Sequence, residues 1–381
     1  MALFIKDEDI ADLAPMSEIV EAMEIAMADH ARAVGPFYPE RIGVRARPPE
    51  GQPGYTLTTQ IGGSVSLNVM AVRLMSNMSA QKRRGERTSA MSEGFNQRNW
   101  GVTVLFDMQT GEMIAVLPQF TLSGLRVGAN TGLATKLLAR ADAETVAVFG
   151  SSKVARGDLE GVAYSRKLKR VQVFSPNAEH RQDFVRDMSE KIGVEIVSAS
   201  SAREALDGAD IITVSTGSRI PVFDGDWLRP GQFVSCTMSS PFPQRRVTPN
   251  WGARYADADP LPGMEIDEKT LMRADLIATL STEMILNENQ RDILDLIDSG
   301  KLNWEKFREI GDIAAGIQPG RRSPEELIVY KSSGGIGLQM AAIGAVVLRN
   351  ARKCGVGKEV GGEWFSADMS FWHKKGFSPT Q

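Results

Sequence analysis

The chain has 381 residues, of which 42% are hydrophobic and 24% are charged. This near-average composition excludes a mainly disordered chain, a collagen-like repeat and a small disulfide scaffold. The 44 Lys and Arg residues against 47 Asp and Glu leave a net charge of −3, which disfavours a nucleic-acid partner. Two distant cysteines, three scattered histidines and no apolar run near the roughly 18 residues of a membrane span predict a cytoplasmic protein with no metal site and no membrane partner.

Short elements are predicted in the N-terminal part of the chain. Apolar spacing predicts helices over 16–34 and 121–140, and Pro and Gly residues separate candidate strands. The predicted strands are 41–47, 55–61, 67–75 and a hairpin over 101–117 that turns at Asp107–Gly111. Segment 79–100 is polar and lacks a period, so we expect a surface loop there.

From residue 145 onwards, apolar runs alternate with helical segments. The runs are 145–150, 170–175, 194–199, 210–216 and 231–237. This alternation predicts an α/β fold with a doubly wound parallel sheet of the Rossmann type. Further on, we expect a helix and a strand after residue 265, more helix over 283–311, a strand near 326 and a long helix ending near 357.

The first strand–turn–helix of this region resembles a dinucleotide-binding turn. Its residues are Gly150, Ser151, Ser152, Lys153, Val154 and Ala155. Against the pattern G-x-G-x-x-G/A, the first glycine and the final alanine fit, while Ser152 occupies the middle glycine position. A buried strand precedes the turn and more strand–helix units follow, so we predict that it binds a pyrophosphate; the alternative is an ordinary turn that binds no nucleotide.

The end of the second strand indicates the choice of cofactor. An acidic residue there binds a ribose 2′-hydroxyl, whereas small polar residues with a nearby arginine accept a 2′-phosphate. Here the strand ends at Ser175, followed by Asn177 and Arg181, with no acid at the strand end. The sequence therefore favours NADP(H) over NAD(H), although NAD(H) stays possible.

Three arginines occupy positions that are unusual for a purely structural role. Arg41 stands at a strand start, Arg73 interrupts an apolar run, and Arg126 sits among small and apolar residues of a predicted helix. A buried charge needs a partner, and a substrate carboxylate matches the forked guanidinium group.

Several blocks, in order, resemble the ornithine cyclodeaminase/mu-crystallin family. They include R-I-G-V at 41–44, V-R-L-M-S-N at 72–77, V-T-V-L-F-D-M-Q-T-G-E at 102–112, T-L-S-G-L-R-V-G-A at 121–129, A-D-I-I-T-V-S-T-G-S-R at 209–219 and R-R-S-P-E-E-L-I-V-Y-K-S-S-G at 321–334. The resemblance implies a dinucleotide-binding domain over 131–319. It also implies a substrate and dimerisation domain of α+β type built from 1–130 and 320–381, and a homodimer.

The resemblance also implies roles for individual residues. Arg41 and Arg126 fall on the family's carboxylate-binding arginines. Thr121, Ser215 and Thr216 fall in motifs that we assign to the cofactor site. Arg73 stands where the family normally has lysine, and since arginine does not release its proton, it can hold an anion but is a poor acid or base.

The family's catalytic position after the strand ending at Thr237 is ambiguous because an insertion follows it. Depending on where the gap is placed, that position is Ser239 or Ser240, or else Asp257 or Asp259. Serines that directly follow the strand are favoured, because sites of α/β folds lie at strand ends.

The resemblance implies hydride transfer between a nicotinamide and the α-carbon of an imino or amino acid, by a ketimine reductase or amino-acid dehydrogenase. Two alternatives stay open: an ornithine-type cyclodeaminase that releases ammonia with a bound NAD, and a non-catalytic NADPH-binding protein. Extra length relative to the family is expected in 79–100, in 241–263 and after 357.

Overall fold

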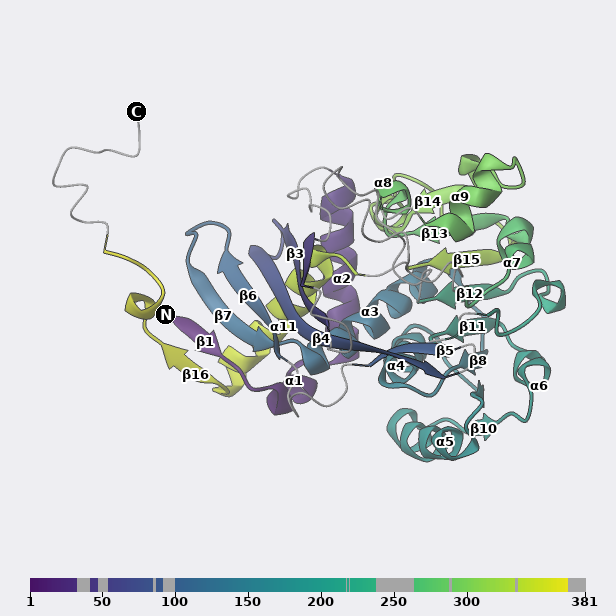
Figure 1. Ribbon diagram of the computed structural model, residues 1–381, viewed down its shortest axis with the longest axis horizontal. Helices are drawn as coiled ribbons and strands as arrows, with labels where there is room; N and C mark the ends of the chain where they lie inside the picture. The colour runs from purple at the N-terminus through teal and green to yellow at the C-terminus, as the bar shows by residue number, and fades with distance from the viewer. Residues whose placement is uncertain are drawn as a thin grey trace.

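The computed structural model describes residues 1–32, 42–46, 54–84, 87–91, 100–216, 218, 220–237, 264–287, 290–332 and 335–368; for 42–46, 54, 56, 77–84 and 87–91 it gives the backbone alone. Two eight-stranded sheets organise this part of the chain. Figure 1 shows the sheets in separate halves of the molecule, with helix α3 (Phe120–Leu138) running between them. Within the described residues, no helix is long and apolar enough to cross a membrane.

The first sheet is parallel throughout, with the order β10-β9-β8-β11-β12-β15-β13-β14. Its strands are β8 (Thr145–Phe149), β9 (Arg170–Phe174), β10 (Ile196–Ser198), β11 (Ile211–Val214), β12 (Phe233–Cys236), β13 (Leu276–Thr279), β14 (Phe307–Glu309) and β15 (Ile328–Lys331). Its helices are α4 (Lys153–Ser165), α5 (Ala178–Ile192), α6 (Ala202–Leu206), α7 (Glu268–Arg273), α8 (Thr282–Asn287), α9 (Arg291–Asp298) and α10 (Ile310–Ala314). The central strands are buried along their whole length, as expected of a sheet covered on both faces. The order reverses between β8 and β11, so the predicted doubly wound fold is confirmed.

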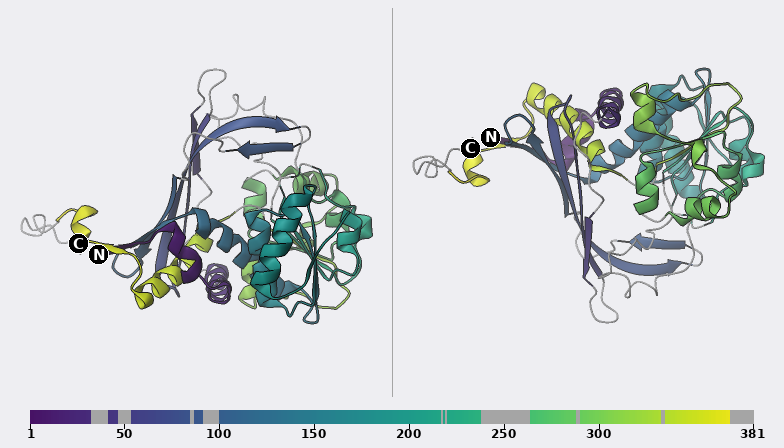
Figure 2. Two further views of the ribbon diagram at one scale, coloured as in Figure 1. Left: turned by 90° about the horizontal axis from the view of Figure 1, so that it is seen from below. Right: turned by 90° about the horizontal axis from the view of Figure 1, so that it is seen from above.

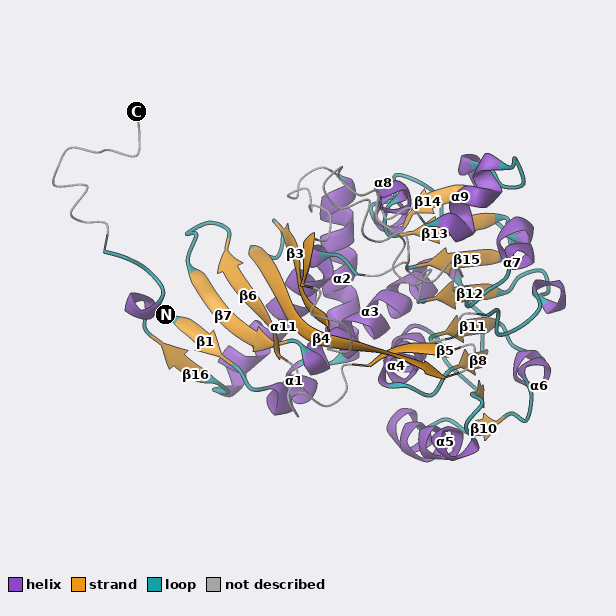
Figure 3. Ribbon diagram, viewed as in Figure 1, coloured by secondary structure: helices purple, strands orange, loops and turns teal. Residues whose placement is uncertain are grey.

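The second sheet is mixed, with the order β16-β1-β7-β6-β4-β3-β2, and β5 pairs with β4. Its strands are β1 (Ala2–Phe4), β2 (Ile42–Ala46), β3 (Gly54–Ser64), β4 (Val69–Arg84), β5 (Arg87–Met91), β6 (Trp100–Asp107), β7 (Met113–Pro118) and β16 (Lys358–Val360). The first and last strands, β1 and β16, pair with each other, so both ends of the chain contribute to this sheet. Helices α1 (Asp7–Leu13), α2 (Met16–Ala31) and α11 (Gly337–Cys354) accompany it (Figure 3).

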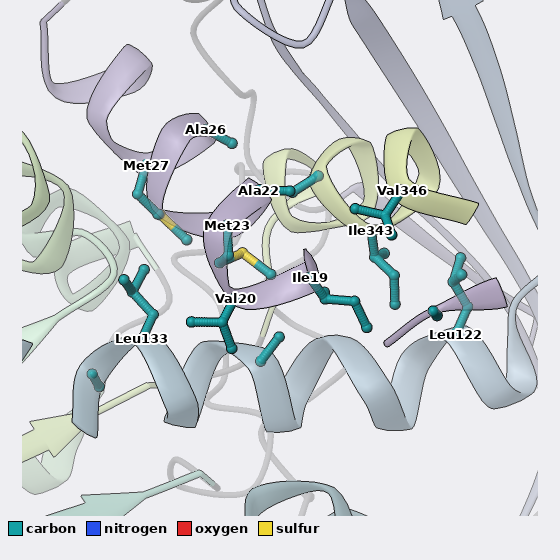
Figure 4. Packing of buried hydrophobic residues seen from close by; sticks show 14 of the residues in the cluster. Ile19, Val20, Ala22, Met23, Ala26, Met27, Leu122, Leu133, Ile343 and Val346 are labelled. Atoms are coloured by element: carbon teal, nitrogen blue, oxygen red, sulfur yellow. The ribbon is translucent and has the colours of Figure 1, made fainter. Parts of the chain in front are cut away.

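Helices α2, α3 and α11 meet in a continuous apolar core. Ile19 and Met23 of α2, Leu122 and Leu133 of α3, and Ile343 of α11 are all buried, and Figure 4 shows their side chains converging. Because α11 also packs on β3 and β4, this core holds α3 against the second sheet.

Glycines bring α3 and α4 into direct backbone contact. A Cβ on Gly128 would overlap the carbonyl group of Gly157, and a Cβ on Gly161 would overlap the carbonyl oxygen of Gly128. Larger residues would force the helices apart, so the small residues fix α3 against the parallel sheet as well. Helix α3 is therefore packed on both halves of the molecule.

The structure differs from the sequence-based prediction in three places. Segment 79–100 contains regular structure: β4 continues to Arg84 and pairs with β5, and Figure 2 shows this hairpin standing out from the body of the sheet. Ladder hydrogen bonds form between backbone groups, so two segments can pair as strands without an apolar period in their sequence. Segment 283–311, predicted to be helical, also contains strand β14 at residues 307–309.

The third difference concerns the domain boundaries. The proposed boundary at 130 falls inside α3, and β15, which lies beyond residue 319, pairs with β12 and β13 in the parallel sheet. The apolar strand β15 forms its backbone hydrogen bonds within the parallel sheet. The chain then continues into α11, which packs on the second sheet.

Candidate active site

The predicted nucleotide turn lies at the point where the strand order reverses. Gly150 follows β8 with a φ of +114°, and a Cβ there would overlap the carbonyl oxygen of Ser215 at the end of β11. Only glycine accommodates both the positive φ and this close approach. Ser152 caps α4 by accepting a hydrogen bond from the Ala155 N–H at 3.5 Å, and Val154 lies in the same first turn. A helix N-terminus behind a glycine turn is suited to binding a pyrophosphate, so these residues fit a dinucleotide.

The residues predicted to select the cofactor gather at the end of β9. Ser175 accepts a hydrogen bond from the Ser151 hydroxyl at 3.1 Å. Arg181 donates Nη1 to the Ser175 carbonyl oxygen and Nε to the Ser198 hydroxyl at 3.1 Å. Asn177 caps α5 by accepting from the His180 N–H at 3.1 Å. The Arg181 guanidinium is thus held beside the strand end.

Arg73 lies on β4 and is buried, with an exposed fraction of 5%. Its Nε and Nη2 donate to Gln119 Oε1 at 3.0 and 2.5 Å, and its Nη1 donates to Gln60 Oε1 at 2.7 Å. A further bond joins Nη2 to the Ser123 hydroxyl of α3 at 3.2 Å. Amide and hydroxyl oxygens therefore fix the orientation of the guanidinium.

Arg126 lies on α3 and is equally buried, at 8% exposed. Its Nη1 donates to Gln339 Oε1 at 2.9 Å, and its guanidinium packs so tightly against Gly335 that a Cβ there would overlap it. The Gln60 side chain donates to the Gly335 carbonyl oxygen. The backbone at Gly335 thus connects the hydrogen-bonding environments of Arg73 and Arg126, which lie 53 positions apart in sequence.

A buried carboxyl group lies at the base of the nucleotide turn. Asp158 of α4 is 0% exposed and accepts hydrogen bonds from the hydroxyls of Thr131 (2.7 Å), Thr237 (3.0 Å) and Ser215. Burial raises the pKa of Asp158, although these three hydrogen bonds and the charge of Arg126 oppose the shift.

A buried ion pair lies at the ends of the neighbouring strands. Lys331, the last residue of β15, places its Nζ 2.7 Å from Asp292 Oδ2 of α9, and both side chains are almost wholly buried. Burial acts to lower the pKa of Lys331, but the hydrogen bond to Asp292 and the negative charges of Asp292 and Glu265 together outweigh it, so the pKa of the lysine is raised. Burial also raises the pKa of the Cys236 thiol, which donates to Glu265 Oε2 at 3.6 Å. Lysine and thiol are thus both in their proton-bearing forms.

The sequence was compared with family models and with known proteins. The model described as the ornithine cyclodeaminase/mu-crystallin family matches residues 52–250, more than half of the chain. The chain belongs to this family. The resemblance drawn from the sequence motifs is confirmed.

Curated relatives of this family include two kinds of reductase. The chain is 30% identical over 235 residues to a Delta(1)-pyrroline-2-carboxylate reductase of Bacillus cereus, covering 61% of this chain and 66% of that relative. It is 26% identical over 231 residues to the ketimine reductase mu-crystallin of Mus musculus, covering 61% and 63%. The chain thus spans just under two thirds of the length of these two relatives.

The fold of the family is also seen in solved structures. The structure of Thermococcus litoralis Delta(1)-pyrroline-2-carboxylate reductase in complex with NADH and L-proline matches with a TM-score of 0.76 at 24% identity, covering 94% of this chain and 100% of that one. An archaeal alanine dehydrogenase dimer with bound NAD matches with a TM-score of 0.74 at 21% identity, covering 94% and 99%. These likenesses show that the chain shares its fold with these structures over 94% of its length.

The structure brings together some of the predicted site residues and leaves others aside. Gly150, Ser151, Ser152, Val154, Ala155, Ser175, Asn177, Arg181, Ser215 and Thr216 lie around the carboxyl ends of β8, β9 and β11. The Thr216 hydroxyl donates to Glu265 at 2.6 Å, and the Thr121 hydroxyl donates to Asp7 of α1 at 2.7 Å. Arg41, Ser239, Ser240, Asp257 and Asp259 lie outside the described residues.

Sequence reasoning missed the polar residues that surround the arginines. Gln60, Gln119 and Gln339 are buried and orient Arg73 or Arg126. An uncharged amide in a strand or helix resembles an ordinary surface residue, so no sequence signal predicted that these three side chains contact the arginines. The sequence around Asp158 carries a weak signal that this residue is buried. Asp158 lies three residues after Ala155, one before Leu159 and four before Val162, so on a helix it shares their buried face.

Proposed function

We propose that this chain is an NAD(P)H-dependent imine reductase or amino-acid dehydrogenase, which transfers hydride between a nicotinamide and the α-carbon of an imino or amino acid. The observation that carries the proposal is the pair of buried guanidinium groups, Arg73 and Arg126, joined through Gly335. The names of the relatives support the same chemistry. An anionic substrate group is the partner that a buried, rigidly oriented guanidinium recognises best.

The proposed mechanism assigns binding to the arginines. A bound nicotinamide supplies the hydride that forms the new C–H bond at the substrate's α-carbon. Arg126, with Arg41, binds the substrate carboxylate, and Arg73 fixes a second negative group or the same carboxylate from the side of β4. Holding the carboxylate at defined atoms presents one face of the C=N bond to the cofactor.

The proton on the imine nitrogen cannot come from Arg73. Arg73 does not give up its proton at neutral pH, so it acts through charge and geometry alone. We propose that the substrate enters as the protonated iminium, whose nitrogen keeps its proton when the C=N electrons become its lone pair. Ser239 or Ser240 is the proposed hydrogen-bonding group at this nitrogen, with Asp257 or Asp259 as the alternative.

The cofactor that we propose is NADP(H), with NAD(H) as the alternative. Gly150, Ser151 and Ser152, with Val154 and Ala155 in the first turn of α4, would hold the pyrophosphate, and Ser215, Thr216 and Thr121 would lie on the nicotinamide side. Ser175, Asn177 and Arg181 would receive a 2′-phosphate, since no acid stands at the end of β9. Mass spectrometry of nucleotide that co-purifies with the protein tests this choice directly.

We further propose that the chain forms a homodimer through the second sheet. Leu57 (38% exposed), Leu74 (36%) and Trp100 (59%) lie on neighbouring strands, and their register places them on one face. The alternate residues of β6, such as Leu105, are buried on the face that α11 covers. An open apolar sheet face of this kind is suited to burial against a second copy.

Cys236 and Cys354 are both free thiols, in keeping with the proposed cytoplasmic location.

A kinetic experiment tests the function. The protein with NADPH or NADH and a cyclic imine bearing a 2-carboxylate should consume the reduced cofactor with stoichiometric formation of the cyclic amino acid. In Arg126→Ala, kcat/KM should fall roughly 10- to 150-fold, the value of a lost charged hydrogen bond of about 1.5–3 kcal/mol, while cofactor affinity stays nearly unchanged.

Two other outcomes would replace the proposal. Release of ammonia from ornithine, without net change in nicotinamide absorbance, would instead identify a cyclodeaminase. Tight NADPH binding with no turnover over a broad panel of imines, amines and oxo acids would identify a non-catalytic binding protein.

A further inference from the structure

Asp158 is the point at which three separate elements are tied together. Its Oδ1 accepts from Thr131 of α3, and its Oδ2 accepts from Ser215, after β11, and from Thr237, after β12. The Ser215 and Thr237 hydroxyls also lie 3.3 Å from each other. The carboxyl group therefore has a hydroxyl donor on three sides, in a region that water does not reach.

Each of these elements carries a part of the proposed active site. The Ser215 carbonyl oxygen lies directly against Gly150, so the end of β11 borders the proposed cofactor site. Arg126 lies five residues before Thr131 on α3, so this helix defines the substrate side. Thr237 follows β12, shortly before the proposed catalytic segment begins.

Helix α3 is itself anchored by polar side chains at several points along its length. Ser123 meets Arg73, Asn130 accepts from the Tyr330 hydroxyl of β15 at 2.9 Å, and Thr131 meets Asp158. Of these bonds, the one to Asp158 leads to the strand end at the nucleotide turn, whereas the one to Tyr330 leads to a strand farther along the sheet.

We propose that Asp158 is a positioning residue that couples the cofactor side of the active site to the substrate arginine Arg126, by holding the ends of β11 and β12 in fixed register with α3. This inference rests on the proposed function. A buried hydrogen-bond network with every member satisfied permits one arrangement of its elements. Hydride transfer is sensitive to such register, because a small misplacement of the reacting atoms costs much of the rate.

The test measures binding coupling, which needs no turnover. The dissociation constant of NADH is measured by nicotinamide fluorescence with and without saturating L-proline, the amine that reduction of a five-membered imine would form. In the wild type, L-proline should tighten NADH binding about fivefold or more, the lower end of ordinary coupling between sites. Two variants are compared. Asp158→Asn keeps polar atoms that can hydrogen-bond to the three hydroxyls, whereas Asp158→Leu has a similar size but no hydrogen-bonding atoms.

The coupling is expressed as the ratio of the NADH dissociation constants without and with L-proline. We expect Asp158→Asn to keep the wild-type ratio and Asp158→Leu to reduce it to about one. In both variants, NADH affinity in the absence of L-proline should change less than about threefold. Tyr330→Phe is the matched control: it removes another buried bond between α3 and the sheet and should keep the coupling. If Asp158→Leu does not fold, Thr131→Val removes only the bond to α3 and should weaken the coupling by itself.

Two results would overturn the inference: a wild type without coupling, or coupling that survives in Asp158→Leu or, where that variant does not fold, in Thr131→Val. Parallel assays of imine reduction distinguish a failure of the proposed role of Asp158 from a failure of the proposed function. Normal coupling without turnover refutes the proposed function alone, whereas turnover with undiminished coupling in the variants refutes the role of Asp158 alone.

Discussion

At the scale of single residues, Arg181 offers the sharpest test of cofactor choice. Its guanidinium is held beside Ser175, where the ribose 2′ group would lie. Arg181→Ala should weaken NADPH binding roughly 10- to 150-fold, because a charged hydrogen bond contributes about 1.5–3 kcal/mol, and should leave NADH binding nearly unchanged. Titration with both cofactors, monitored by fluorescence, measures the two dissociation constants.

Arg186→Ala is the matched control for that experiment. Arg186 lies on the same helix, is 68% exposed and pairs with Asp183 and Asp187, so its removal should affect neither cofactor. An equal loss of NADPH and NADH affinity in Arg181→Ala would contradict the assignment.

The buried carboxyl group of Asp158 should make stability depend on pH. Burial raises its pKa in the folded chain, whereas the unfolded chain has an ordinary Asp pKa near 3.9. The folded state then binds the proton more tightly, so this contribution to stability is complete below the unfolded pKa and is lost as pH rises through the folded pKa.

Asp158→Asn lacks this titration. We therefore expect the free energy of unfolding of the variant to increase relative to that of the wild type as pH rises from 4 to 7. Urea unfolding of both proteins across that range measures the difference. A difference that stays constant with pH would show that Asp158 titrates alike in the folded and unfolded chains.

At the scale of elements, the crossing of α3 and α4 depends on absent side chains. A methyl group on Gly128 would collide with the backbone of Gly157, which cannot move without separating the helices. Gly128→Ala should therefore reduce the free energy of unfolding by about 2 kcal/mol or more, even though alanine favours helix. Chemical denaturation measures this loss.

Gly124→Ala, one turn earlier on the same helix, serves as the control. Its methyl group would meet only the flexible Lys153 side chain, at 3.4 Å, so we expect a neutral or slightly stabilising effect. Equal effects of the two substitutions would mean that the crossing is looser than its geometry indicates.

At the scale of the whole molecule, the proposed homodimer depends on the open face of the second sheet. Leu74→Asp places a charge at the centre of the apolar face, next to Leu57 and Trp100, and burying that charge against a partner is costly. We expect the variant to sediment as a monomer at concentrations where the wild type is a dimer. Ile317→Asp, at a residue 56% exposed elsewhere on the surface, should leave the dimer intact. A wild type that sediments as a monomer would refute the proposed assembly.

The sequence predicted those parts of the molecule that carry a local signal. Buried parallel strands read as continuous apolar runs, and Gly150 and Gly111 mark turns that need a positive φ. The α/β class, most elements and the family followed from such signals. The outer part of β4 and its partner β5 are polar in sequence and show no apolar period, so these strands were missed.

The sequence by itself determined the parallel sheet, the glycine turn after β8 and the unusual placement of Arg73 and Arg126, because apolar runs, glycines and charges among apolar residues are visible one residue at a time. Only the tertiary structure decided which groups meet. The pairing of β1 with β16, the three glutamines around Arg73 and Arg126, and the hydroxyls around Asp158 join residues up to several hundred positions apart. Such contacts depend on how whole elements pack, and an amide or hydroxyl carries no mark in sequence of the partner it will find.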